Sequence, residues 1–173
     1  MAVDIRLASC KRQDQNPLLE AAVFYLLLYT GLRESELVNL NFGQYKGDTL
    51  LNIRRKGQRI SKKILVPREA ALHVNNYLAD EMRDSDAPLF TNRGSNRLHR
   101  IDVINICKRL SMLTPDRVKL TPHMLRHTFL KRITDKHGVH IAQKLSGNVS
   151  IKEIFRYAKP SEDESMSVVE KLF

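Results

Sequence analysis

The sequence predicts a mainly α-helical domain with one small three-stranded antiparallel β-sheet, an α+β fold. Apolar residues recur at helical spacing over several stretches, and capping residues, prolines and glycines mark their ends. Between residues 41 and 67 this pattern gives way to short apolar and β-branched runs separated by glycine-containing turns. A chain of 173 residues, 42% hydrophobic and 28% charged, has the composition of one folded domain with its own core.

The first predicted helix begins at Pro17. Asn16 can cap it, and proline suits the first helical position because no backbone N–H is needed there. The following residues are strongly apolar up to Gly31, which can end the helix in the left-handed conformation. This helix is therefore expected to lie in the core, and a second, short helix is expected over 32–40.

The predicted sheet lies between residues 41 and 67. The runs 49–54 and 60–66 are rich in apolar and β-branched residues, and the turn signals 46–48 and 56–58 each contain glycine. These two runs are the clearest strands, and a third strand is expected to complete the sheet.

Helical patterns occupy most of the remaining chain, over about 68–82 and 99–113. Thr121 and Pro122 start a further helix that is expected to reach about residue 136, and Gly138 precedes two shorter segments, 139–145 and 150–157. A last helix is expected in the tail. The domain organisation that follows is a linker or stub over 1–16, one domain over 17–160 and a C-terminal tail over 161–173.

The charge of the chain suggests a nucleic-acid partner. A formal net charge of +10, from 29 Lys and Arg against 19 Asp and Glu, is typical of proteins that neutralise phosphates. Residues 161–173 are acidic by contrast, so the tail is expected to meet a different partner. A basic protein without a nucleic-acid role is the alternative, which charge alone does not exclude.

The sequence points to a cytoplasmic protein with no membrane partner. No apolar run reaches the roughly 20 residues of a membrane span, and no secretion leader is recognisable. Cys10 and Cys107 lie far apart in the sequence without a CxxC pair. Neither a disulfide framework nor a thiolate zinc site is therefore expected.

The helix after Pro122 carries a polar face made of His123, Arg126 and His127, which are spaced i, i+3 and i+4. Two histidines four residues apart can hold zinc, as in the HExxH proteases. Here no glutamate lies between them, and Arg126 would place a positive charge beside the metal. We therefore expect this face to contact an anionic ligand and expect no metal.

Other basic residues have two interpretations when each group is taken alone. Arg33 and Glu36 could form an ordinary surface ion pair in the short second helix. Six bases between residues 54 and 63 make the predicted hairpin either a solvated ribbon or a phosphate-contacting one. The bases that would make such contacts with a nucleic acid are Arg54, Arg55, Arg59, Lys62, Lys63, Arg93, Arg97 and Arg100.

Taken in order, these segments resemble the tyrosine recombinase family, which includes phage integrases and Xer-type recombinases. Residues 30–37, Thr-Gly-Leu-Arg-Glu-Ser-Glu-Leu, resemble its first arginine box, and 56–59, Lys-Gly-Gln-Arg, resemble the hairpin turn that carries its mobile lysine. Residues 123–127 match its HxLRH box, and 145–148 stand where the family has Leu-Gly-His. Tyr157 follows at the family's spacing to the nucleophile, although a lone tyrosine is more often structural. The resemblance covers about residues 17–160.

The resemblance implies a DNA strand cutting and rejoining enzyme with the catalytic-domain fold of that family. Its implied catalytic residues are Arg33, Lys56, His123, Arg126, Asn148 and Tyr157, with Glu36 and His127 in support. Arginine forks suit the non-bridging phosphate oxygens, a lysine can protonate the leaving oxygen, and a histidine can assist proton transfer. No metal or other cofactor is implied.

Two departures from the family pattern stand out. Asn148 occupies a position where the family usually has histidine, and an amide can donate one hydrogen bond but cannot act as an acid near neutral pH. We expect a supporting contact and slower chemistry, unless Asn148 only caps the helix that begins near Ser150. The second departure is the lack of the amino-terminal DNA-binding domain that family members usually carry, which suggests a catalytic fragment or a short protein.

The partners implied are double-stranded DNA and further copies of the chain. In the family, tails such as 161–173 act as exchanging helices that hold a tetramer on DNA, so the isolated chain could be a monomer; folding of the tail onto its own domain is the alternative. The implied source is bacterial or phage-derived, with nucleoid association. The alternatives in function are a type IB topoisomerase-like nicking and sealing enzyme, or a catalytically weakened DNA-binding domain of the same fold.

Overall fold

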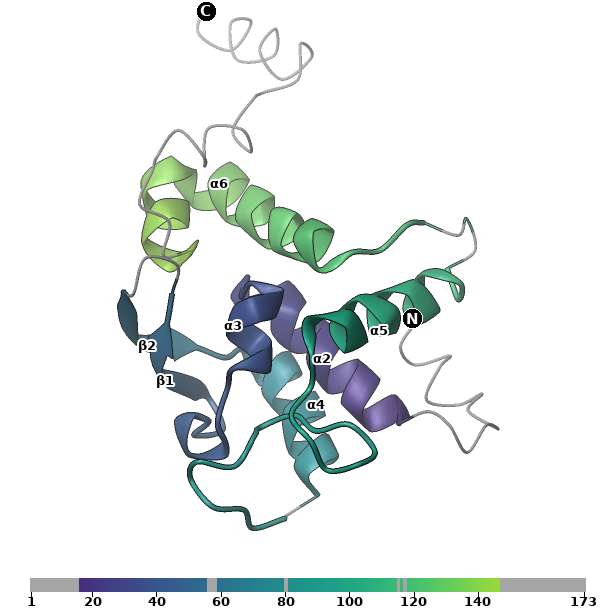
Figure 1. Cartoon of the computed structure of the whole chain (residues 1–173). Coiled ribbons are helices and arrows are strands. Elements are labelled where there is room, and N and C mark those ends of the chain that lie inside the picture. Colours follow the sequence, from purple (N-terminus) through teal and green to yellow (C-terminus); the bar gives the residue numbers. More distant parts are fainter. Residues whose placement is uncertain (1–15, 56–58, 80, 115, 117, 147–173) are drawn as a thin grey trace, which may run out of the picture. The chain divides into compact units, whose positions relative to one another are not determined.

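The computed structural model describes residues 16–55, 59–79, 81–114, 116 and 118–146. Its elements are α2 (Pro17–Thr30), α3 (Glu34–Val38), the short 3-10 helix η1 (Phe42–Gln44), β1 (Thr49–Arg54), β2 (Ile60–Leu65), α4 (Arg68–Leu78), α5 (Arg100–Ser111) and α6 (Pro122–Ser146) (Figure 1). The chain divides into two units, residues 1–129 and 130–173. The mainly helical character predicted from the sequence is confirmed.

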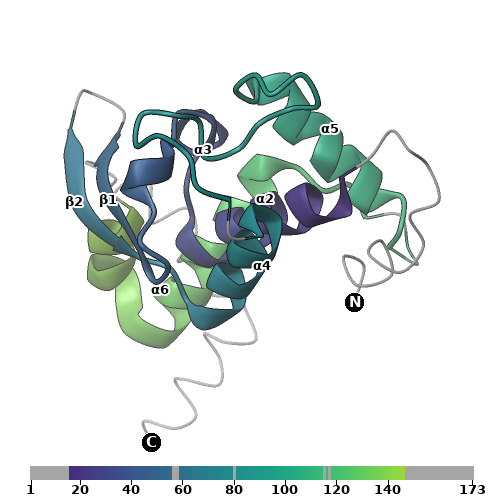
Figure 2. The ribbon, with the colours of Figure 1, turned by 90° about the horizontal axis from the view of Figure 1, so that it is seen from below.

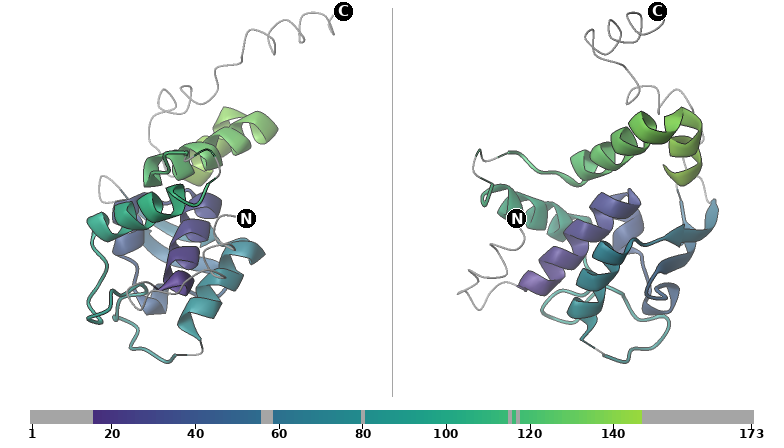
Figure 3. Two further views of the ribbon diagram at one scale, coloured as in Figure 1. Left: turned by 90° about the vertical axis from the view of Figure 1, so that its right-hand side faces the viewer. Right: turned by 180° about the vertical axis from the view of Figure 1, so that it is seen from behind.

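Helix α2 is the central element of the first unit. The Asn16 side chain accepts a hydrogen bond from the Leu19 N–H at 3.0 Å, and Gly31 ends the helix with φ 62°. Buried residues lie on nearly every side of α2, because α4 runs along one side and α5 contacts another (Figure 3). The predicted helix start, helix end and core position are all confirmed.

The hairpin formed by β1 and β2 is antiparallel, with Thr49 opposite Leu65 and Arg54 opposite Ile60. It lies beside α3 (Figure 2). Beyond the strands, the Arg55 N–H donates to the Arg59 carbonyl at 2.7 Å and extends the pairing by one residue. This arrangement brings the turn end of the hairpin to the helix that follows Gly31.

The predicted three-strand count is not confirmed, because the sheet in the described residues has two strands. In the described chain before β1, residues 42–44 form the 3-10 helix η1, and the bridge to the hairpin is an isolated one between Tyr45 and Leu50. The Gln44 side-chain amide donates to the Leu51 and Asn52 carbonyls at 3.2 and 3.0 Å. A side chain thus satisfies two β1 carbonyls to which the backbone of a third strand could have donated.

Helix boundaries differ slightly from the predicted ones. Helix α4 ends at Leu78, earlier than predicted, because Ala79 adopts a left-handed conformation with φ 45°. Within α6, Gly138 has φ 78° and ψ 168°, which are not helical values, so the predicted break at this glycine is confirmed. No helix in the described part of the chain combines the length and hydropathy of a membrane span.

Candidate functional site

Arg33 and Glu36 form the centre of the candidate site, at the start of α3. The Arg33 backbone N–H donates to Glu36 Oε2 and its guanidinium Nη1 donates to Glu36 Oε1, both at 2.9 Å. The Glu36 side chain is 4% exposed and that of Arg33 is 24% exposed. A buried carboxylate that holds both the backbone and the side chain of one arginine is more than the surface ion pair considered from the sequence.

The same carboxylate also binds Arg55. The Arg55 guanidinium donates through Nη1 to Glu36 Oε2 at 2.8 Å and through Nε to Ser61 Oγ at 3.1 Å. Its side chain is 2% exposed. The structure therefore places Arg55 in the interior and not on an exposed ribbon, because its guanidinium is used within the protein and has almost no surface to offer a DNA backbone.

This cluster holds two guanidinium groups and one carboxylate. Burial lowers the pKa of Arg55 and is the largest influence on it, Glu36 raises that pKa, and the charge of Arg33 lowers it further. Arginine nevertheless keeps its charge in proteins, so the cluster retains one positive charge that no carboxylate in it balances.

An open polar groove of about 680 Å³ lies over this cluster. Arg33, Glu36, Arg54 and Arg55 line it, together with amide side chains that include Asn39 and Asn52. Such a groove can accept an anionic, hydrogen-bonding ligand, because a cation and several amide groups face it.

Arg126 belongs to the first turns of α6, and its backbone lies in the same unit as Arg33. It is buried, and its Nη1 donates a hydrogen bond to the Gly31 carbonyl. His123 and His127, on the same helix, are exposed. The sequence predicted a packed side that includes Leu125 and a polar side, and the two histidines and Leu125 confirm this. Arg126 differs, because its side chain points inward to the segment that precedes Arg33.

The lack of a side chain at Gly31 allows the first turns of α6 to lie close to the backbone between α2 and α3. A Cβ atom at this position would lie 2.2 Å from Phe129 Cδ1, and the backbone φ of 62° is one that L residues rarely adopt. The first arginine box and the HxLRH box, about ninety residues apart in sequence, therefore meet at a glycine.

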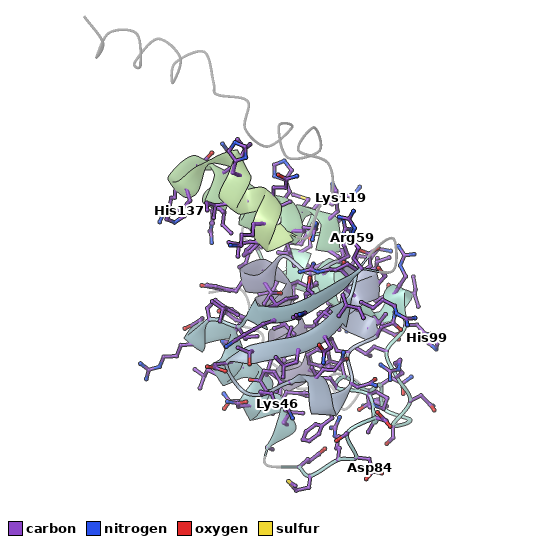
Figure 4. The ribbon with its side chains drawn as sticks, turned by 90° about the vertical axis from the view of Figure 1, so that its left-hand side faces the viewer. Lys46, Arg59, Asp84, His99, Lys119 and His137 are labelled. Atoms are coloured by element: carbon purple, nitrogen blue, oxygen red, sulfur yellow. The ribbon has the colours of Figure 1, made fainter. Side chains whose placement is uncertain are left out.

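The remaining bases expected to contact DNA have different environments. Arg97 donates to the Val38 and Leu40 carbonyls, both at 3.0 Å, and to Asn41 Oδ1 at 2.6 Å, so it fastens its loop to the chain after α3. Arg100 pairs with Glu34 while remaining 64% exposed. The others are exposed: Arg54, Arg59, Lys62, Lys63 and Arg93. Figure 4 shows Arg59 near the turn end of the hairpin and Lys46 near its open end.

Three predicted catalytic residues, Lys56, Asn148 and Tyr157, lie outside the described residues, and their roles stay predictions. Sequence reasoning missed the internal role of Arg55. Strand alternation carried a usable signal, because consecutive residues point to opposite faces and Arg54 and Arg55 cannot both face outward. In the part of the chain that is described, no group of His, Cys, Asp or Glu side chains is placed to hold a metal ion.

Comparisons with known proteins agree on one family. Residues 5–164 match the model of the phage integrase family. Tyrosine recombinase XerC of Chromobacterium violaceum is 34% identical over 137 residues, which are 76% of this chain and 45% of that protein. Tyrosine recombinase XerS of Streptococcus agalactiae is 29% identical over 168 residues, 92% of this chain and 47% of that protein. The chain thus spans about half the length of these curated relatives.

Solved structures share the fold. The crystal structure of XerA recombinase superimposes with a TM-score of 0.76 at 20% identity, over 98% of this chain and 59% of that one. XerH site-specific recombinase, solved in a post-cleavage complex with its palindromic difH substrate, gives 0.77 at 18% identity, over 97% of this chain and 48% of that one. With the family model matched along most of its length, this chain belongs to the phage integrase family of tyrosine recombinases.

Proposed function

We propose that this chain is the catalytic domain of a site-specific DNA recombinase, which cuts one strand of double-stranded DNA and rejoins it to a partner strand. Family membership supports the reaction class, since the XerC and XerS relatives are tyrosine recombinases. The observation that carries the proposal is the guanidinium of Arg33, fixed by buried Glu36 in an open groove, with Arg126 bonded to the nearby Gly31 carbonyl. Arg33 and Arg126 thus meet at residues 31–33, and two neighbouring guanidinium groups can bind one phosphate.

In the proposed reaction, the Tyr157 phenol loses its proton and attacks the scissile phosphorus. A bond forms between phosphorus and the tyrosine oxygen, and the bond from phosphorus to the 5′ oxygen breaks. Lys56 gives the departing 5′ oxygen a proton, and His123 assists proton transfer with His127 in support. Arg33 and Arg126 stabilise the charge that builds on the non-bridging oxygens, and Asn148 donates one further hydrogen bond.

The product of this step is a 3′-phosphotyrosyl DNA intermediate. It conserves the energy of the broken phosphodiester, so a 5′ hydroxyl of a partner strand can reverse the chemistry without ATP or another cofactor. The family model and the recombinase relatives favour this outcome over simple nicking and sealing.

The proposal extends to organisation and location. Residues 17–160 form the catalytic domain, 1–16 a linker or stub, and 161–173 an exchanging helix through which copies assemble on DNA, as a tetramer when bound and as a monomer in isolation. Exposed Arg54, Arg59, Lys62 and Lys63 contact the DNA backbone. The site of action is nucleoid DNA in a bacterial cytoplasm.

A nicked suicide duplex tests the proposal. Loss of a short fragment after cleavage prevents religation, so the covalent complex accumulates and migrates slowly on a denaturing gel. We expect an adduct with the wild-type chain and none with Tyr157→Phe, because the phenylalanine variant lacks the attacking oxygen. Binding of the duplex without any adduct would instead identify a DNA-binding domain that has lost the chemistry.

A further inference from the structure

We propose that Arg55 is a positioning residue, which acts through Glu36 to keep Arg33 oriented and electrostatically available for the scissile phosphate. The inference rests on the proposed function. It assigns Arg55 a place behind the site, where the sequence pattern had suggested a contact with DNA.

The geometry links the two arginines through one carboxylate. Glu36 Oε1 accepts from Arg33 Nη1, while Glu36 Oε2 accepts from the Arg33 backbone N–H and from Arg55 Nη1. Since α3 is only five residues long, its own hydrogen bonds give Glu36 little support. Arg55, from the hairpin, donates to Glu36 Oε2, the same oxygen that accepts the Arg33 backbone N–H at the start of α3. It thereby fixes the position of this oxygen.

The charge balance explains why Arg55 matters for chemistry as well as for folding. With Arg55 in place, the cluster of Arg33, Glu36 and Arg55 carries a net single positive charge. Without it, Glu36 neutralises Arg33, and a phosphate in the groove meets an ion pair where it had met a cation. The loss of this positive charge destabilises the transition state more than the bound substrate, because negative charge on the phosphate oxygens increases in the transition state.

The shape of the guanidinium is also required. Arg55 directs Nη1 to Glu36 and Nε to Ser61, two donors that point to different partners from one rigid plane. Lysine keeps the charge but has a single terminal nitrogen on a flexible stem, so it cannot hold both partners at the same geometry. Arg55→Lys is therefore a sensitive variant that preserves the charge of the interior.

The experiment compares Arg55→Lys and Arg55→Met with the wild type on the nicked suicide duplex. The cleavage rate is measured in single turnover at saturating DNA, and the Kd is measured separately. We expect the rate to fall about 10-fold for Arg55→Lys and about 100-fold for Arg55→Met, the size seen when one transition-state donor is disturbed or lost. The Kd should change by less than about three-fold, because the exposed bases supply most of the binding.

Arg109→Lys is the matched control. Arg109 donates through Nε to buried Glu20 at 2.7 Å, so this pair also joins an arginine to an enclosed carboxylate, but neither residue lines the groove over Arg33. The same substitution there should lower thermal stability and leave the cleavage rate within about two-fold of wild type.

The outcomes separate this inference from the function on which it rests. Absence of an adduct with the wild-type chain removes the proposed function and the inference with it. If the wild type forms the adduct, a wild-type cleavage rate for Arg55→Lys overturns the inference alone. A loss confined to the Kd also overturns it. Should Arg55→Met fail to fold, Arg55→Lys still decides, because it keeps a cation in the interior beside Glu36.

Discussion

At the scale of single residues, the buried polar groups of the first unit are joined to specific partners. Glu36 holds two arginines, Arg97 donates to backbone carbonyls, and the Tyr45 hydroxyl donates to Asn75 Oδ1 at 2.8 Å. Such pairing is required because an unpaired buried polar group costs about 1–3 kcal/mol. Apart from Arg33, which is three residues from Glu36, these partners come from distant parts of the sequence, so the pairs also fix tertiary structure.

Tyr45 gives a prediction of alkaline stability. Burial, and secondarily Asp48, raise the pKa of Tyr45 from 10.0 to about 12. Above pH 10 the unfolded chain releases the phenolic proton while the folded chain keeps it, so the unfolded state binds fewer protons and stability falls as pH rises. The contribution of the neutral phenol is complete below pH 10 and is lost as pH rises through about 12.

We expect Tyr45→Phe to remove this dependence. Between about pH 9 and about pH 11 its free energy of unfolding, measured by urea denaturation, should fall by about 1 kcal/mol less than that of the wild type. If the free energy of unfolding changed with pH in the same way for both proteins, the prediction would be wrong, because the Tyr45 phenol would then have the same pKa in the folded and unfolded states.

Residue identity in the candidate site was largely readable from the sequence, but residue environment was not. The boxes around Arg33 and Arg126 were evident because their residue types and spacing are distinctive. The burial of Arg55 depends on where the hairpin meets α3, a contact between residues 19 positions apart. The residue pattern within one segment does not predict a contact between distant segments. The hydrogen bonds of Arg97 to the chain after α3 could not be predicted for the same reason.

At the scale of elements, caps and glycines carried most of the predictive information. Asn16, Pro17 and Gly31 set both ends of α2 through local backbone chemistry, so their effect could be foreseen. The third strand was mispredicted because the bonds from the Gln44 amide to β1 are tertiary, and they favour the coiled η1 over an extended chain.

Two glycines at which helical geometry is interrupted, Gly31 after α2 and Gly138 within α6, predict contrasting stability losses. Gly31 and Gly138 both have positive φ, but an added Cβ meets Phe129 at 2.2 Å in the first case and nothing within 4 Å in the second. Gly138→Ala should cost about 1–2 kcal/mol through backbone strain alone. Gly31→Ala should cost more than about 3 kcal/mol, because strain and a steric clash add.

Thermal unfolding followed by circular dichroism measures both losses. The Gly31 variant should also bind DNA less tightly than the Gly138 variant at a temperature where both are folded, since the Gly31 carbonyl receives the Arg126 hydrogen bond. Equal losses of stability in the two variants would show that the Phe129 ring moves aside at little cost.

At the scale of the whole molecule, the net charge of +10 is distributed among bases with different tasks. Arg54 lies opposite Ile60, and Lys62 is two residues further along β2, so Arg54 and Lys62 share one face of the hairpin, and both are exposed. Arg55 lies inside and Arg97 fastens a loop. Only part of the basic surplus is therefore available to phosphates.

The salt dependence of DNA binding measures how many of these bases contact phosphates. Each phosphate contact contributes about 0.9 to the slope of log Kd against log salt concentration. The double variant Arg54→Met/Lys62→Met should therefore lower that slope by about 2, with similar weakening on unrelated DNA sequences. Lys46→Met, an exposed lysine near the opposite end of the hairpin (Figure 4), is the control and should leave the slope unchanged. Equal effects of the two variants would contradict a DNA-contacting face.

The neighbouring arginines of β1 have a consequence for how the hairpin folds. If β1 slipped by one residue, Arg54 would take the place of Arg55 at the carboxylate, and the ion pair would survive the error. The slip would, however, move Ile53, which is 2% exposed, to the exposed position of Arg54. Exposing this side chain would cost about 1.5–3 kcal/mol. Burial of Ile53 therefore sets the register of the hairpin, and the position of the buried Arg55 follows from it.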